Sequence, residues 1–187
     1  MSKIAIVYFS GYGHTVFAAE AVAAGAREAG AEVDVIRISE SGEITDADWA
    51  TLEGADAIVY GSPTYMGGPA WQFKRFADAS SKAWFERKWL DKLAGGFTVS
   101  ASTIGDKGET LNYFQTLAGQ HGQLWVSLGL QPNSALDKTP DDINWTGNFS
   151  ALAAIKRADA PAEPLAKGDE AAARHYGARI AALAGKR

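Results

Sequence analysis

The chain has 187 residues, of which 47% are hydrophobic and 21% are charged, and its formal net charge is -4. This length and composition predict one soluble globular domain over residues 1–187. The mildly acidic charge argues against nucleic acid or an anionic membrane surface as a partner. Because Cys is absent, a disulfide framework, a thiolate metal site and a cysteine nucleophile are excluded, and we expect no bound metal.

The beginning of the chain and its hydropathy bear on location. Met1-Ser2-Lys3 leads directly into an apolar run, which leaves no space for a signal peptide. No apolar run is long enough to span a membrane. We therefore expect a cytoplasmic protein without a membrane partner.

Short apolar runs alternate along the chain with longer segments of helical pattern. The runs predict five strands, at residues 4–9, 32–38, 56–60, 95–100 and 123–128. Helices are expected at residues 15–29, 46–52, 70–80 and 109–118, followed by a final helix capped by Asp169. Gly30 suits the end of the first helix, and Pro69 suits the first turn of the third. Residues 129–164 are expected to be irregular.

Strands that alternate with helices predict an α/β fold with a parallel sheet and right-handed crossovers. Five strands suit the flavodoxin-like order 2-1-3-4-5, with helices on both faces of the sheet. This order reverses between the first and third strands, so the loops that follow them flank one crevice. Loops of small residues at 10–15, 62–68 and 100–108 should therefore converge at the carboxyl edge of the sheet.

The first of these loops has the composition of a phosphate site. It joins a buried strand to a helix, so backbone amides and the positive helix terminus meet there. The loop matches neither the dinucleotide fingerprint nor the P-loop pattern, and no Lys or Arg lies between Phe9 and Glu20. Hydroxyls of Ser10 and Thr15 would hold a monophosphate without a metal. The alternative is a plain strand-to-helix turn in which Thr15 is only an N-cap.

This sequence lacks the residues that several other enzymes and signalling proteins of this architecture require. A phosphatase would need a Cys in the first loop, and a receiver domain would need an Asp where Gly61 and Ser62 follow the third strand. The G-x-S-x-G pattern of serine hydrolases is absent. Ser10 could act as a nucleophile, but the sequence places no base beside it. Flavin mononucleotide (FMN), with its phosphate on the first loop, remains.

The three loops resemble the FMN loops of the WrbA-like flavoproteins, which are NAD(P)H:quinone oxidoreductases within the flavodoxin-like NADPH-dependent FMN reductase group. The resemblance runs from residue 4 to about residue 130, and Ser62-Pro63-Thr64-Tyr65 is its most specific segment. It implies cofactor-binding residues in each loop. These are Ser10, Gly11, Tyr12, Gly13, His14, Thr15 and Val16 for the phosphate, Pro63, Thr64, Tyr65, Met66 and Gly67 under the ring, and Ser100, Ala101, Ser102, Thr103, Ile104 and Gly105 around its polar edge.

The same resemblance implies residues for substrates. His121 matches a histidine that reaches the flavin, Tyr12 matches a tyrosine that meets nicotinamide, and Trp84 matches a tryptophan that lines the substrate side. His121 and Tyr12 are the candidate catalytic residues, with roles in bonding the quinone oxygen. NADH or NADPH would be the co-substrate. In departures from the family, Ala101 and Ile104 replace smaller or more polar residues, and Asp106-Lys107 replace a glycine run.

Two other functions stay open on the sequence. One is a flavodoxin-type electron carrier without its own substrate, and the other is a flavin-binding regulatory protein. Carriers usually dock through a strongly acidic face, whereas this chain is only mildly acidic and is basic at 82–88. The large aromatic residues at 71–89 further predict a homodimer or homotetramer, because one chain can hardly bury them all.

Overall fold

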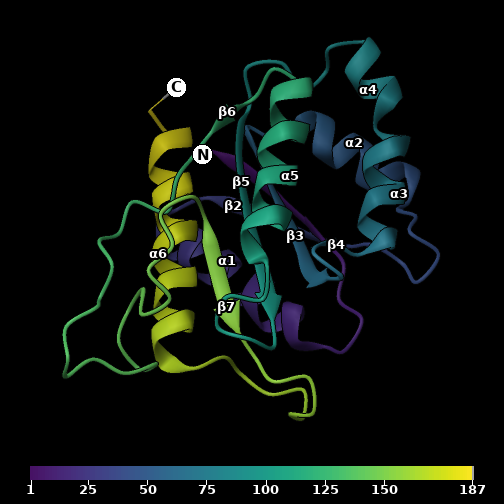
Figure 1. Ribbon diagram of the computed structural model, residues 1–187. Coiled ribbons are helices and arrows are strands. Elements are labelled where there is room, and N and C mark those ends of the chain that lie inside the picture. The colour runs from purple at the N-terminus through teal and green to yellow at the C-terminus, as the bar shows by residue number, and fades with distance from the viewer. Residues whose placement is uncertain (187) are drawn as a thin grey trace.

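The computed structural model describes residues 1–186, and its strands and helices alternate along the chain (Figure 1). The strands are β1 (Lys3–Tyr8), β2 (Glu32–Arg37), β3 (Ala57–Tyr65), β4 (Gly68–Pro69), β5 (Leu93–Ser100), β6 (Leu124–Trp125) and β7 (Leu152–Ile155). The helices are α1 (His14–Glu28), α2 (Asp46–Gly54), α3 (Trp71–Ala79), α4 (Ser81–Phe85), α5 (Lys107–Gln120) and α6 (Lys167–Ala184).

The main sheet is parallel and has the order β2-β1-β3-β5-β6. This confirms the predicted flavodoxin-like order, with β5 in the fourth place. The fifth place is shared by two short strands. β6 pairs with the start of β5 through Leu93 and Leu124, and β7 pairs with its end through Phe97 and Leu152.

The strand β7 lies in the segment that was expected to be irregular, and the sequence pattern did not predict it. Its residues are Leu152–Ile155, and three of the four are buried. The run is short and half alanine, a residue with weak strand preference, so it gave no local signal. The strand predicted at 123–128 is correspondingly reduced to two residues, although Val126 N still donates to Ala94 O at 2.8 Å.

Helices cover both faces of the sheet, as predicted. Neighbouring residues of β5 show this directly. A Cβ placed on Gly95 would lie 2.8 Å from Ile180 of α6, whereas one on Gly96 would lie 2.7 Å from Phe114 of α5. Because successive strand residues point to opposite faces, α6 and α5 lie on opposite sides of the sheet.

Helices α1 and α6 pack against each other through two glycines. A Cβ on Gly25 would lie 1.9 Å from the carbonyl oxygen of Arg174, and one on Gly177 would lie 1.9 Å from that of Val22. Only glycine allows the two backbones to come so close. This contact fixes the second half of α1 against α6.

Two element ends differ from the sequence expectation. β3 runs through Tyr65 and returns as the hairpin partner β4, with Met66 and Gly67 at the corner in the left-handed region. Two consecutive positive φ angles suit a tight two-residue hairpin turn. Asp169 does not cap α6, which begins at Lys167. Its carboxylate instead accepts a hydrogen bond from Ile155 N at 2.9 Å, at the end of β7.

Candidate functional site

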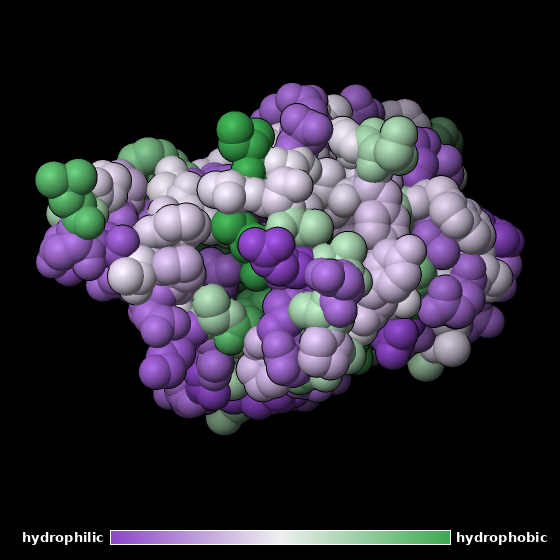
Figure 2. Space-filling view, turned by 60° about the horizontal axis from the view of Figure 1, so that its bottom comes forward, coloured by the Kyte–Doolittle hydropathy of each residue, from purple (hydrophilic) through white to green (hydrophobic). Residues whose placement is uncertain are grey.

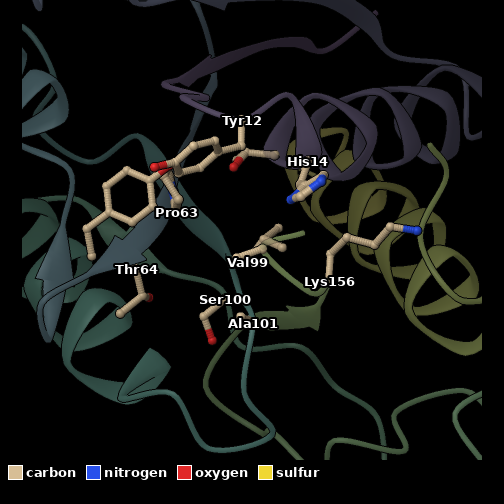
Figure 3. A pocket seen from close by; sticks show the side chains of 11 residues that line it. Tyr12, His14, Pro63, Thr64, Val99, Ser100, Ala101 and Lys156 are labelled. Atoms are coloured by element: carbon tan, nitrogen blue, oxygen red, sulfur yellow. The ribbon is translucent and has the colours of Figure 1, made fainter. Parts of the chain in front are cut away.

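A cavity of about 230 Å³ opens at the carboxyl edge of the sheet. The space-filling view brings this edge forward and shows hydrophobic surface inside a hollow near its centre (Figure 2). All three predicted loops line the cavity, and a fourth segment joins them (Figure 3). The lining residues are Tyr12, His14, Thr15, Pro63, Thr64, Tyr65, Val99, Ser100, Ala101, Lys156 and Ala158.

The first loop offers donors without partners. Ser10 is fully buried, and its Oγ has no hydrogen-bond partner among the described residues. The helix α1 begins at His14 after Gly13, whose φ of 87° is left-handed, and no side chain caps it. Its first N–H groups and its positive dipole end are therefore free for an anion. The arrangement fits a phosphate group, and Thr15 is the second residue of the helix rather than its N-cap.

A basic side chain reaches this loop from a neighbouring strand. Arg37 ends β2, and its Nη2 donates to the carbonyl oxygen of Ser10 at 3.2 Å. The loop itself contains no Lys or Arg, and Arg37 lies 27 residues away from Ser10 in the sequence. The parallel pairing of Arg37 with Tyr8 brings it beside the end of β1. The sheet order alone could have suggested this neighbour.

In the second loop, Thr64 is held by hydrogen bonds, and Tyr65 places an aromatic ring at the cavity. Thr64 Oγ1 shares hydrogen bonds with Thr98 at 2.8 Å and Thr110 at 2.7 Å. The Tyr65 ring meets Tyr12 edge-on with centroids 5.9 Å apart, and burial raises the pKa of Tyr65 to about 12. Tyr65 is therefore a neutral hydrogen-bond donor at physiological pH. Met66, at the hairpin corner, is fully exposed.

The third loop divides into a lining part and a rim. Ser100 and Ala101 line the cavity, whereas Ser102, Thr103 and Ile104 are exposed at its edge. Backbone hydrogen bonding joins this loop to the end of β7, because Lys156 N donates to Ser100 O at 3.0 Å. The third loop and the segment after β7 thus form one wall.

The segment after β7, residues 156–165, closes the cavity beside α1. His14 Nε2 donates to Ala160 O at 3.0 Å, and Lys156 Nζ bonds the Glu163 carboxylate at 2.8 Å. The Cβ of Ala162 would lie 2.9 Å from a Cβ on Gly13. No residue of the 156–165 segment was predicted for the site, because its sequence carries no motif and only long-range contacts place it there.

His121 and Trp84 do not lie at this cavity. His121 follows the last turn of α5, and the next residue, Gly122, accepts a hydrogen bond from Asp91 N before the start of β5. This is the amino edge of the sheet, and the 14-residue helix separates it from the carboxyl edge by roughly 20 Å. Trp84 lines a separate surface hollow together with His121. Within one chain, His121 is thus not placed for its expected contact with the flavin, and Trp84 is not placed for its expected contact with the substrate.

The surroundings of His121 are those of a structural side chain. It is 5% exposed, its Nε2 bonds Ser80 Oγ at 2.9 Å, and its ring lies 4.2 Å from that of Trp89. Burial lowers its pKa to about 4, so the imidazole is neutral at physiological pH. His121 therefore does not contact the cavity of its own chain.

The parallel sheet and the anion-accepting first loop define a flavodoxin-like protein with a cofactor crevice at its carboxyl edge. Residues 3–128 match the model of the family described as NADPH-dependent FMN reductase. The chain belongs to this family, which confirms the resemblance seen in the loops. Among the described residues, no helix could cross a membrane.

Individual relatives span nearly the whole chain. One is Flavodoxin FldP of Pseudomonas aeruginosa, 46% identical over 98% of this chain and 97% of the relative. Another is NAD(P)H dehydrogenase (quinone) of Chromohalobacter salexigens, 34% identical over 100% of this chain and 98% of the relative. The crystal structure of the flavodoxin, WrbA-like protein from Agrobacterium tumefaciens has a TM-score of 0.81 at 47% identity, covering 100% of this chain and 99% of that one.

Proposed function

We propose that the protein is an FMN-dependent oxidoreductase that takes hydride from NADH or NADPH and reduces quinones. Two observations carry the proposal: the unpartnered, fully buried Ser10 Oγ in the loop that leads into the uncapped start of α1, and the cavity that all three predicted loops line. Relatives named NAD(P)H dehydrogenase (quinone), 34% identical and of nearly equal length, support the choice of substrates.

The chain's own residues would bind, orient and shield the cofactor. When bound, FMN would supply the hydride and electron chemistry between the nicotinamide and the quinone. Ser10, Thr15 and the first amides of α1 would hold its phosphate, with Arg37 adding positive charge nearby. The second and third loops would flank its ring. Hydride transfer requires no strong acid, so positioning and exclusion of water are the contributions that the protein has to make.

Tyr12 is the substrate-side residue that one chain can offer. It lines the cavity and is 69% exposed, so its ring can pack against an incoming nicotinamide or quinone. Exposed Trp84 could contact a substrate only from a neighbouring copy in a homo-oligomer, whereas His121 is buried in its own chain. Exposed Trp71, Trp84 and Phe85 along α3 and α4 support such an assembly.

A second candidate is an electron carrier without a substrate of its own. The relative named Flavodoxin FldP, at 46% identity, favours it. A carrier would use the same FMN site, but it would exchange electrons with a partner protein and would not accept hydride from a nucleotide.

Anaerobic reduction distinguishes the two candidates. The FMN-loaded protein is mixed with NADPH, and separately with NADH, while the absorbance of oxidised flavin is followed. Rapid bleaching, then recovery on addition of a benzoquinone, is the result expected of the oxidoreductase. A flavin that stays oxidised with either nucleotide but is reduced by dithionite would identify a carrier. Failure of the apoprotein to bind FMN would overturn both.

A further inference from the structure

The ammonium group of Lys107 lies inside the third loop. Lys107 is the first residue of α5 and is 3% exposed. Its Nζ donates to Ser100 Oγ at 2.9 Å, to Ser102 O at 2.6 Å and to Thr103 O at 3.0 Å. The loop is therefore folded around a cation. Since Ser100 also lines the cavity, the charge lies one side chain behind the cavity wall.

The conformation of the loop depends on this arrangement. Residues 101–104 are exposed, so packing against the core does not hold them. Gly105 and Asp106 both have left-handed φ angles, of 51° and 52°, and turn the chain back toward Lys107. A Cβ on Gly105 would lie 2.2 Å from Ser100 Oγ, which leaves room only for glycine.

The position is unfavourable for a cation. The first turn of a helix is the positive end of its dipole, and burial penalises the charged form of a lysine. Burial lowers the pKa of Lys107, and the more distant carboxylate of Asp169 opposes this only in part. Among residues 1–186, none of the ion pairs within 4.0 Å involves Lys107. An anionic group in the cavity would provide the missing compensation.

We propose that Lys107 is a positioning residue that shapes the third loop for FMN, and that its charge favours reduced over oxidised FMN. The inference rests on the FMN site proposed above. Two-electron reduction adds negative charge to the flavin ring, and a fixed positive charge behind the wall stabilises the reduced form more than the neutral oxidised ring.

Lys92 provides a matched control at the other end of the same strand. It is also partly buried, with a lowered pKa, and its Nζ also donates to backbone carbonyls, those of Glu53 and Ala55. It precedes β5, whereas Lys107 follows it. The experiment compares Lys107→Met, Lys107→Arg and Lys92→Met with the wild-type protein. For each, the Kd of oxidised FMN, the flavin midpoint potential and the thermal unfolding of the apoprotein are measured.

Lys107→Met should weaken the binding of oxidised FMN at least fivefold and that of reduced FMN at least tenfold more. That further tenfold corresponds to a midpoint potential about 30 mV more negative for a two-electron couple. Lys107→Arg keeps the charge and should retain the wild-type potential, and Lys92→Met should change neither quantity. A purely structural role would weaken both redox forms equally and leave the potential unchanged. That result, or equal potentials for Lys107→Met and Lys107→Arg, would overturn the charge effect.

The unfolding measurement keeps these outcomes interpretable. A Lys107→Met apoprotein that unfolds at the wild-type temperature is folded, so any loss of FMN reflects the site itself. If that variant instead fails to fold, Lys107→Gln, which keeps a donor but not the charge, carries the same comparison of potentials. Wild-type protein that binds no FMN would overturn the proposed function and this inference together. Normal FMN binding by every variant would overturn this inference alone.

Discussion

Ser10→Ala should separate the stability of the protein from its affinity for FMN. The Ser10 hydroxyl is buried without a partner, so the apoprotein bears the desolvation cost of an unmade hydrogen bond, about 1–3 kcal/mol. Removing the hydroxyl relieves that cost but leaves a small void. We therefore expect the free energy of unfolding of the apoprotein to stay unchanged or to rise by about 1 kcal/mol.

The same substitution should weaken FMN binding. A hydrogen bond to a charged phosphate contributes about 1.5–3 kcal/mol. At about 1.4 kcal/mol for each factor of ten, the Kd of FMN should rise about 10- to 150-fold. The double variant with Thr15→Ala should bind more weakly still. Fluorescence titration of FMN into apoprotein measures the Kd, and urea denaturation of the same samples measures stability.

Ser80→Ala is the control, because its buried hydroxyl is bonded. Ser80 Oγ donates to Ala77 O at 2.7 Å and contacts His121 Nε2 at 2.9 Å, at the opposite edge of the sheet. This variant should lose about 1–3 kcal/mol of stability and keep its FMN affinity. The reasoning is refuted if Ser10→Ala destabilises the apoprotein as Ser80→Ala does while FMN affinity stays constant.

Three further predictions concern packing, pH and assembly. Gly177→Ala should lower the free energy of unfolding by about 1–3 kcal/mol, because its Cβ would collide with Val22 O; equal melting temperatures would contradict the close α1–α6 contact. Burial raises the pKa of Asp169 from 3.8 to about 6. Between these pH values the native state binds more protons than the unfolded state, so the free energy of unfolding falls as pH rises through that window. Asp169→Asn should therefore raise stability by about 1–3 kcal/mol at pH 7.5 and by little at pH 4, as denaturation at both pH values can check. Light scattering should report that the wild-type protein is a dimer or tetramer at micromolar concentration. If the Phe85→Lys variant is a monomer, the interface includes α4. A wild-type protein that is a monomer would contradict the assembly.

The sequence predicted the order of the sheet because its signals are local. Runs of apolar β-branched residues mark β1 and β3, and small residues mark the loops that follow them. The parallel arrangement then requires these loops to meet at one edge, as the lining of the cavity by Tyr12, Thr64 and Ser100 illustrates. The strand β7 escaped prediction because a short, alanine-containing run stays in place only when β5 offers an edge to pair with.

The sequence by itself determined the fold class, the family and the three loops of the crevice. Only the tertiary structure decided which charged side chains lie at or near that crevice. Arg37 arrives through strand pairing, Lys107 through the folding back of its loop, and Lys156 through β7. It also placed His121 at the amino edge, where motif similarity alone had suggested the flavin. The physical reason is that motifs record local backbone requirements, whereas a long side chain acts wherever distant segments of the chain bring its charged end.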